Sequence, residues 1–285
     1  MSSSADLYCV MGNPVAHSRS PAIHARFAEL TGEHLVYERC LLPIDGFAQG
    51  VRDFIARGGR GCNVTVPFKI EAAALATHRS ERVQLAGAAN TLVFGPDGIH
   101  ADNTDGLGLV ADITRNAGLP LAGRDVLLVG AGGAAAGVLG PLLQAGVRHI
   151  TVANRTLARA QALVQAHADL ALLQNTELLA LTPQALEANF DLIINATASS
   201  LAGDAVPVPA HVLRTGSMAY DMMYGPAAQG FLDWARQHGA VPRDGLGMLV
   251  EQAAEAFALW RGIRPDTAPV LSALRTQLLA EGAHP

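Results

Sequence analysis

The chain has 285 residues, of which 50% are hydrophobic and 16% charged, and its formal net charge is −5. This much apolar material supports a sizeable core and argues against disorder, while the scattered basic residues argue against a nucleic-acid partner. No apolar run approaches the roughly 20 residues that span a bilayer, and residues 1–6 lack the pattern of a signal peptide, so we expect no membrane association.

The cysteines and histidines do not form the pattern of a disulfide framework or a metal site. The three cysteines, Cys9, Cys40 and Cys62, are odd in number and widely spaced. The ten histidines lack the spacing of metal ligands. We therefore expect no disulfides and no metal ion, and a cytoplasmic location fits reduced thiols.

In the first hundred residues, short apolar runs alternate with helical patterns, which is typical of an α/β fold. The expected strands cover residues 7–11, 35–42, 61–66, 91–94 and 99–103. The last two flank a Gly-Pro-Asp-Gly run that favours a hairpin turn. We expect one helix to begin at Ser20-Pro21 with Ser20 as its N-cap, a second to cover residues 44–57, and Pro67 to open a third.

The pattern then predicts a second unit, a nucleotide-binding domain of roughly residues 106–244. Its expected strands cover residues 125–129, 148–153, 190–195 and 217–222. Several of these are continuous apolar runs, as in a parallel sheet that is covered on both faces. Helical patterns cover residues 107–117, 134–145, 157–168 and, after this domain, 247–261.

The run Gly-Ala-Gly-Gly-Ala-Ala directly follows the expected strand at 125–129 and opens an Ala-rich helical stretch. It matches the G-x-G-x-x-A fingerprint in the strand–turn–helix context that the fingerprint requires. The first glycine allows a sharp turn, the second leaves room for a pyrophosphate, and the alanine lets helix and strand pack closely. Free N–H groups and the helix dipole favour phosphate there. The residues expected to cradle a dinucleotide are Gly130, Ala131, Gly132, Gly133, Ala134 and Ala135.

The next strand indicates which dinucleotide binds. NAD-dependent enzymes usually place an acidic residue about 20 residues after the first glycine, but no acid lies between Asp125 and Asp169. Arg155 occupies that region, between Asn154 and Thr156, and Arg159 follows one helical turn later. A guanidinium matches a phosphate in fork geometry, so the pattern favours NADP. The alternative is that both arginines are merely solvated at a helix start.

Four polar clusters in the first unit follow expected strands, where ligands bind in open parallel sheets. Residues 12–21 place Ser18 and Ser20 at a helix N-terminus, which suits a carboxylate, although Ser20 could be only a cap. Residues 63–69 place Asn63 and Thr65 on one face of a strand, which is unusual in a buried strand unless a ligand satisfies them, and Lys69 follows. The other clusters are residues 87–91 and 102–106; each cluster could also be turn chemistry.

Together these segments resemble the shikimate dehydrogenase family over nearly the whole chain. The matching segments are GNPVAHSRSP (12–21), NVTVPFK (63–69), GAANT (87–91), DNTDG (102–106), GAGGAA (130–135), NRT (154–156), NAT (195–197), YDMMYGP (220–226) and DGLGMLVEQA (244–253). The resemblance implies two α/β domains with a cleft between them. Residues 1–105 plus 245–285 would form an N-terminal, discontinuous substrate-binding and catalytic domain, and residues 106–244 a Rossmann-type NADP-binding domain. Monomers and homodimers both occur in the family.

The resemblance also implies roles for single residues. Ser18 and Ser20, helped by Tyr224, would bind the substrate carboxylate, and Lys69 and Asp105 would form the catalytic pair, with the mobile proton on either. The residues implied to hydrogen-bond the ring hydroxyls are Asn63, Thr65, Asn90, Asp105 and Gln252. Those implied to surround the adenosine ribose and its phosphate are Asn154, Arg155, Thr156 and Arg159, and those along the nicotinamide are Thr197, Met222, Gly245 and Met248. Many relatives carry Arg at the position of Ala136, and its loss would weaken cofactor binding a little.

The implied activity is the reversible reduction of 3-dehydroshikimate to shikimate by NADPH, in the shikimate pathway of chorismate and aromatic amino acid biosynthesis. One alternative is a quinate/shikimate dehydrogenase of broader specificity, which the run at 154–156 disfavours. A methylene-tetrahydrofolate dehydrogenase would give no reason for the Ser18 and Ser20 pair. A non-catalytic NADP-binding regulator would not need both Lys69 and Asp105.

Overall fold

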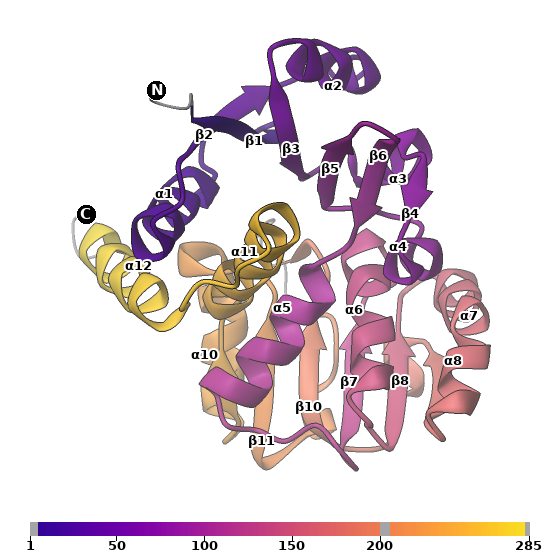
Figure 1. Ribbon diagram of the computed structural model, residues 1–285. Coiled ribbons are helices and arrows are strands. Elements are labelled where there is room, and N and C mark those ends of the chain that lie inside the picture. The colour runs from indigo at the N-terminus through magenta and orange to yellow at the C-terminus, as the bar shows by residue number, and fades with distance from the viewer. Residues whose placement is uncertain (1–4, 200–205, 283–285) are drawn as a thin grey trace. The chain divides into compact units, whose positions relative to one another are not determined.

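Figure 1 shows the computed structural model of the chain, which describes residues 5–199 and 206–282. The chain divides into two compact units, one of residues 1–108 and 250–273 and the other of residues 109–249 and 274–285. Each unit is built on a six-stranded sheet. The expected α/β class is confirmed. The assignment of residues 1–105 plus 245–285 to the substrate and of residues 106–244 to the cofactor stays a prediction.

The first unit contains a mixed sheet with the strand order β2-β1-β3-β5-β6-β4. Its strands are β1 (Asp6–Gly12), β2 (Leu35–Leu41), β3 (Gly59–Val64), β4 (His78–Arg79), β5 (Thr91–Gly95) and β6 (Gly98–Asp102). β1 is parallel to β2 and β3, β5 is antiparallel to β3 and β6, and β4 is parallel to β6. The expected hairpin is present, because Gly95 pairs with Gly98 across Pro96 and Asp97.

Five helices begin within residues 5–108. They are α1 (Ser20–Thr31), α2 (Phe47–Ala56), α3 (Lys69–Leu75), α4 (Glu81–Ala86) and α5 (Asp105–Ala111). Phe47 and Phe68 stack at 5.1 Å between ring centroids. They belong to one buried cluster with Phe54, Cys9 and Cys62, so the side chains of α2 and of the turn before α3 form the core together with those of β1 and β3.

The start of α1 differs from the expectation that Ser20 is its N-cap. Ser20 is the first helical residue, and Arg19 holds the cap position without a side-chain cap bond. The Arg19 carbonyl already accepts a helical hydrogen bond from the Ile23 N–H. The Ser18 hydroxyl oxygen accepts the Ser20 N–H at 3.3 Å. The serine whose side chain bonds to the start of the helix is therefore Ser18, one residue before the cap position.

The segment between β3 and α3 also differs from the expectation. β3 ends at Val64, and α3 begins at Lys69 rather than at Pro67. The Phe68 N–H donates to the Thr65 carbonyl at 3.0 Å. Pro67 therefore lies inside a tight turn between the two elements, and Thr65 lies just beyond the strand.

The second unit contains an all-parallel sheet with the strand order β12-β11-β10-β7-β8-β9. Its strands are β7 (Asp125–Val129), β8 (His149–Ala153), β9 (Glu177–Leu181), β10 (Phe190–Asn195), β11 (Leu213–Asp221) and β12 (Val241–Arg243). β8 and β9 lie on one side of β7 in the sheet, and the later strands β10, β11 and β12 lie on the other side. This is the doubly wound Rossmann order, whose switch point lies between β7 and β10.

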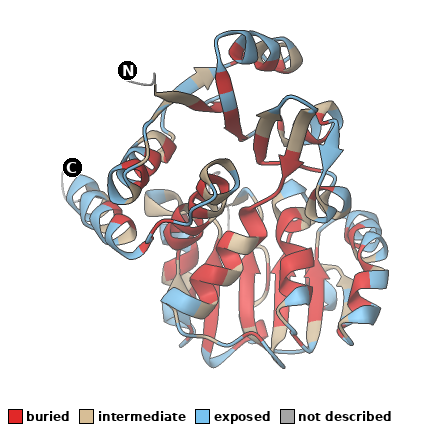
Figure 2. Cartoon of the chain, in the orientation of Figure 1, coloured by how far each residue is buried: buried red, intermediate tan, exposed pale blue. Residues whose placement is uncertain are grey.

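Helices flank this sheet, and its central strands are buried, as Figure 2 shows in red. The helices of this unit are α6 (Gly133–Gln144), α7 (Leu157–Ala166), α8 (Ala168–Leu173) and α10 (Gln229–Gln237), while α11 (Leu246–Arg261) and α12 (Ala268–Gly282) each have residues in both units. A π-helical segment, Asp112–Asn116, continues α5, and short 3-10 turns cover Pro183–Ala185, Ala210–Val212 and Gly225–Ala228. α7 contacts β8 and β9, and α10 contacts β11 and β12. Among the residues that the structure describes, none forms a helix long and apolar enough to cross a membrane.

Candidate active site

Lys69, at the start of α3, is the only lysine in the sequence. Its Nζ lies 2.5 Å from Oδ2 of Asp105, the first residue of α5, and the two side chains are 23% and 10% exposed. Hydrogen bonds between two ionised groups are short and roughly twice as strong as neutral ones. The structure thus brings together two predicted residues that lie 36 positions apart, and leaves the ammonium group partly open to a ligand.

Asn90 holds the other oxygen of the Asp105 carboxylate. Its side chain is 2% exposed, and its Nδ2 lies 2.8 Å from Asp105 Oδ1 and 3.0 Å from both Thr104 Oγ1 and Gln252 Oε1. Its Oδ1 accepts the Thr104 N–H at 2.8 Å. The amide therefore joins the residue before β5, the start of α5 and α11 at one point, and it fixes the carboxylate that faces Lys69.

Asn63 is buried at the end of β3, with 6% exposure. Its Oδ1 accepts the Tyr37 hydroxyl at 2.8 Å, and its Nδ2 donates to Thr91 Oγ1 at 3.1 Å and to the Asn90 carbonyl at 3.3 Å. Protein groups thus satisfy the amide of Asn63, so its burial alone does not require a ligand, and its role in substrate binding stays a prediction. Thr65 lies just beyond the strand and is half-buried, so its side chain is more accessible to a ligand than that of Asn63.

Ser18 and Ser20 lie at the start of α1, half-buried and buried respectively. The Arg39 guanidinium donates to the Ser18 carbonyl through Nε at 3.2 Å and through an Nη at 2.7 Å. Arg39 thereby fixes the loop before α1 and places a positive charge beside Ser18. This surrounding charge favours an anion such as a carboxylate.

Tyr37, on β2, is a residue that sequence reasoning missed. Desolvation raises its pKa well above the usual value, and a hydrogen bond with Ser20 opposes that rise. Because the same hydroxyl donates to Asn63, Tyr37 links the serine loop to the amides near Lys69. A single tyrosine in an alternating strand carries no signal of such a role. Thr104, also missed, lies inside a motif that the sequence did single out.

The glycine turn of the second unit lies at the switch point of its sheet. Gly130 has a φ of +110°, which L side chains rarely adopt, and a Cβ there would lie 3.1 Å from Thr197 Cγ2 and 3.2 Å from the Ala196 backbone. The Ala196 N–H donates to the Val129 carbonyl at 2.9 Å. The ends of β7 and β10 therefore meet at a position that only glycine fits.

Gly132 and Gly133 differ from Gly130, because a Cβ on either would meet nothing within 4 Å. Both are exposed, at the N-cap and the first residue of α6, while Ala135 is fully buried against the sheet. Open space thus lies over the backbone where first-turn N–H groups point outward. This arrangement fits a pyrophosphate, as the fingerprint predicts.

Two exposed arginines follow β8, the strand next to β7. Arg155 and Arg159 form no ion pair within the part of the chain that the structure describes. Asn154 is held in place, since its Nδ2 donates to the Thr156 carbonyl at 2.9 Å. Two uncompensated guanidinium groups at this strand end fit the extra phosphate of NADP.

Asn195, which is buried, organises the predicted nicotinamide residues. Its Oδ1 accepts the Thr197 N–H at 3.1 Å and the Thr197 hydroxyl at 2.7 Å, and its carbonyl accepts the Met222 N–H at 3.1 Å. Its Nδ2 donates to Asp221 Oδ2 at 3.2 Å. Thr197 and Met222 are thus placed side by side at the ends of β10 and β11. Asn195 and Asp221 are further residues that the sequence analysis did not assign.

The last three predicted residues also belong to the second unit. A Cβ on Gly245 would lie 2.3 Å from the Met222 carbonyl oxygen, so close approach of two backbones requires glycine there. Met248 is 7% exposed. Tyr224 is half-buried beyond β11, whereas the other predicted substrate-binding residues belong to the first unit.

Comparison with known proteins agrees with these features. Residues 10–92 match a family model described as "Shikimate dehydrogenase substrate binding domain", residues 112–203 one described as "Shikimate / quinate 5-dehydrogenase", and residues 245–275 one described as "Shikimate 5'-dehydrogenase C-terminal domain". A protein of Acidovorax sp. (strain JS42) named "Shikimate dehydrogenase (NADP(+))" is 75% identical over 98% of this chain and 99% of its own length.

Solved structures give the same result. An Ael1 enzyme from Pseudomonas putida has a TM-score of 0.88 and 46% identity, covering 95% of this chain and 98% of that one. A shikimate 5-dehydrogenase from Thermus thermophilus in complex with NADP(H) and shikimate has a TM-score of 0.82 and 33% identity, covering 95% and 99%. The chain belongs to the shikimate dehydrogenase family.

Proposed function

We propose that the chain catalyses the reversible, NADPH-dependent reduction of 3-dehydroshikimate to shikimate, a step of the shikimate pathway to chorismate and the aromatic amino acids. The observation that carries the proposal is the 2.5 Å contact between Lys69 and Asp105, because carbonyl reduction needs a proton donor held in a fixed position. The name of the 75% identical relative supports the choice of substrate and cofactor, as does the related structure in complex with NADP(H) and shikimate.

The second unit would hold the cofactor, which supplies the hydride when bound. The turn from Gly130 to Ala135 would bind the pyrophosphate, and Asn154, Arg155, Thr156 and Arg159 the adenosine ribose and its phosphate. Thr197, Met222, Gly245 and Met248 would border the nicotinamide. The open space over Gly132 and Gly133 and the two arginines without carboxylate partners support this assignment.

Lys69 would donate a hydrogen bond, and then a proton, to the carbonyl oxygen as that oxygen becomes an alkoxide. Asp105 holds the ammonium through Oδ2, while Asn90 holds Oδ1, so the donor is oriented before the substrate arrives. In the reverse direction the same pair would take the proton from the hydroxyl. General acid catalysis of this kind contributes about 10²- to 10⁴-fold in rate.

The remaining groups of the first unit would orient the substrate. Ser18, whose carbonyl binds the Arg39 guanidinium, and Ser20 would bind the carboxylate with Tyr224. Thr65 and Gln252 would bind ring hydroxyls together with Asn90 and Asp105. Asn63 would bind a hydroxyl only by exchanging one of the hydrogen bonds that its amide makes to protein groups. A cytoplasmic location is proposed as well, on the ground that Cys9, Cys40 and Cys62 are free thiols.

The test is an absorbance assay at the NADPH band. The purified chain should consume NADPH on addition of 3-dehydroshikimate, and should reduce NADP⁺ on addition of shikimate. Quinate with NADP⁺ or NAD⁺ is the specificity control, and it should give much slower turnover. Fast quinate oxidation with NAD⁺ would instead support the broader dehydrogenase, and no turnover with any pair would support a regulator that only binds NADP.

A further inference from the structure

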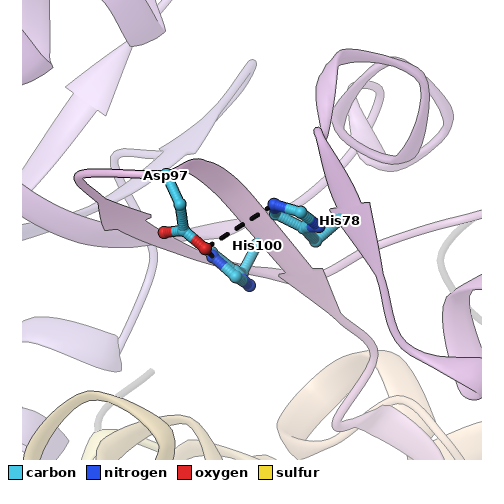
Figure 3. Close-up of side chains that lie close together, drawn as sticks. All are labelled: His78, Asp97 and His100. Carbon is cyan, nitrogen blue, oxygen red and sulfur yellow. Dashed lines mark hydrogen bonds and ion pairs between the residues drawn. The ribbon is translucent and has the colours of Figure 1, made fainter.

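Three side chains at the edge of the first sheet form a cluster outside the residues to which the proposed function gives roles. His100 Nε2 lies 2.9 Å and His78 Nε2 3.6 Å from the same oxygen, Oδ2 of Asp97, and the two imidazole rings stack at 4.4 Å between centroids. Figure 3 shows the carboxylate directed toward both rings. One ligand atom from each of the three residues lies within 4.8 Å of the others.

The backbone places these side chains independently of any ligand. His78 pairs with His100 in the parallel register of β4 and β6, so the two rings leave the sheet on the same face. Asp97 lies in the turn of the β5–β6 hairpin. The residues just before the two histidines are also joined. Thr77 donates its N–H to the Ile99 carbonyl at 2.9 Å and accepts the Ile99 N–H through Oγ1 at 3.2 Å. Backbone hydrogen bonds therefore fix the positions of His78 and His100.

The two separations between an imidazole nitrogen and the carboxylate oxygen are close to those of ligands around one small cation. For bonds of about 2.0–2.1 Å in tetrahedral geometry, two ligand atoms lie about 3.3 Å apart. The observed separations of 2.9 and 3.6 Å bracket this value.

We infer that His78, Asp97 and His100 form a binding site for a divalent transition-metal ion of the Zn²⁺ class. Two imidazoles and one carboxylate suit Zn²⁺, Cu²⁺ or Ni²⁺, whereas Ca²⁺ and Mg²⁺ prefer oxygen ligands. The side chains of His78, Asp97 and His100 are 49%, 59% and 42% exposed, so water would complete the coordination. The bound ion would join the two-residue strand β4 to the β5–β6 hairpin.

Sequence reasoning excluded this site for a physical reason. The two histidines lie 22 positions apart, and only the pairing of β4 with β6 brings them together. Known short-range patterns place metal ligands within a few positions of each other on one helix or loop. A site built across two strands leaves no such pattern.

The experiment is a calorimetric titration of the full chain, free of any affinity tag, with ZnCl₂ in a buffer without phosphate or chelator. The wild type should bind one Zn²⁺ per chain at this site. His78→Gln and His100→Gln should each weaken binding by at least about tenfold, the loss seen when even an outer-shell partner of a metal site is removed. The matched control is His34→Gln, which removes an exposed histidine outside the cluster and should bind as the wild type does.

A second measurement separates loss of the site from loss of folding. Zn²⁺ should raise the thermal unfolding midpoint of the wild type and of His34→Gln, because an ion that binds only the folded state stabilises it, and should raise it less in the two cluster variants. Without Zn²⁺, all four proteins should turn over NADPH equally. Equal Zn²⁺ affinity in wild type and His78→Gln, or no Zn²⁺ binding by the wild type, would overturn the proposal.

Discussion

Lys69 and Asp105 owe their geometry to a neutral side chain, the amide of Asn90. A carboxylate that faces one ammonium can rotate about its χ2 angle, but both oxygens of Asp105 are engaged, one by Lys69 and one by Asn90. Burial of Asn90 makes this arrangement costly to break, because an unpaired buried amide loses about 1–3 kcal/mol. The pair is thus held before any ligand binds.

Lys69→Ala should lower kcat by about 10²- to 10⁴-fold, because the alkoxide then lacks its proton donor. The Kd for NADPH, measured by fluorescence titration, should stay unchanged, since the predicted cofactor residues lie elsewhere. Glu71→Ala, in the same short helix α3, is the matched control. Normal turnover in the Lys69 variant would remove that residue from the chemistry.

The double variant Arg155→Ala with Arg159→Ala should raise the KM for NADPH far more than that for NADH. Both guanidinium groups lack a carboxylate partner among the described residues, so their charge is available to the 2′-phosphate that only NADPH carries. Steady-state kinetics with the two cofactors measure the ratio. Arg236→Ala, which removes an exposed arginine of α10 paired with Asp233, should leave the ratio unchanged, and an equal rise for both cofactors would contradict the assignment.

His24 predicts how stability depends on pH. It is fully buried, neither ring nitrogen has a hydrogen-bond partner among the described residues, and its ring stacks on Tyr37 at 4.3 Å. Burial lowers its pKa from 6.5 to about 3. Between these two values the unfolded chain binds a proton that the folded chain does not, so stability must fall as the pH falls from 6.5 toward 3.

His24→Phe should therefore unfold at higher denaturant concentration than the wild type, and the difference should grow on acidification. At pH 5 the lost proton linkage is worth about 2 kcal/mol. Urea unfolding at pH 7.5 and at pH 5 measures the difference between the two proteins. A difference that does not change with pH would show that His24 is not the titrating group.

At the scale of elements, the turn between β7 and α6 contains two glycines, Gly130 and Gly132, that are needed for different reasons. Gly130→Ala should lower the free energy of unfolding by about 1–3 kcal/mol, because its φ is +110° and its Cβ would crowd the start of the segment after β10. Gly132→Ala has ordinary backbone geometry and open space around its Cβ. It should leave stability nearly unchanged but weaken NADPH binding, since the methyl group occupies the position where a pyrophosphate would approach.

Chemical denaturation and fluorescence titration of both variants check this contrast. If Gly132→Ala binds NADPH as the wild type does, the phosphate does not lie over that backbone. If Gly130→Ala is as stable as the wild type, the turn relaxes without strain. Each result contradicts one of the two assignments alone.

The elements that the sequence predicts well are those whose own residues decide them. The apolar runs Asp125–Val129 and Phe190–Asn195 are strands with the expected bounds, because both lie in the centre of a buried parallel sheet. The short edge strands β4, β9 and β12 were missed, as were the helices α4, α10 and α12. The residues of the three strands are mostly exposed or half-exposed, so pairing with a neighbouring strand, rather than a hydrophobic pattern, makes them regular.

The same limit applies to the candidate site. Residues such as Gly130 and Lys69 can be predicted from the sequence because each lies in a short motif of neighbouring residues. The contacts of Asn63 with Tyr37 and of Asn90 with Gln252 join positions 26 and 162 residues apart. No local pattern encodes such pairs, and for that reason Asn63 was expected to need a ligand that its neighbours make unnecessary.

At the scale of the whole molecule, the two units are predicted to bind different ligands. Hydrogen exchange read by mass spectrometry tests this assignment. NADP⁺ alone should slow exchange in residues 129–136 and 153–159, and shikimate alone should slow it in residues 63–69 and 102–106, because each ligand covers backbone and reduces local opening. Slower exchange in the first unit with NADP⁺ alone would contradict the assignment of the cofactor to the second unit.

That Lys69 is the only lysine of the chain has a practical consequence for spectroscopy. Reductive methylation with ¹³C-formaldehyde would label one side-chain amine besides the α-amino group, and dimethylation keeps the nitrogen basic. An NMR pH titration of that single methyl resonance would then follow the proposed proton donor directly, with shikimate present or absent. In a chain with many lysines the same signal would be lost among surface amines.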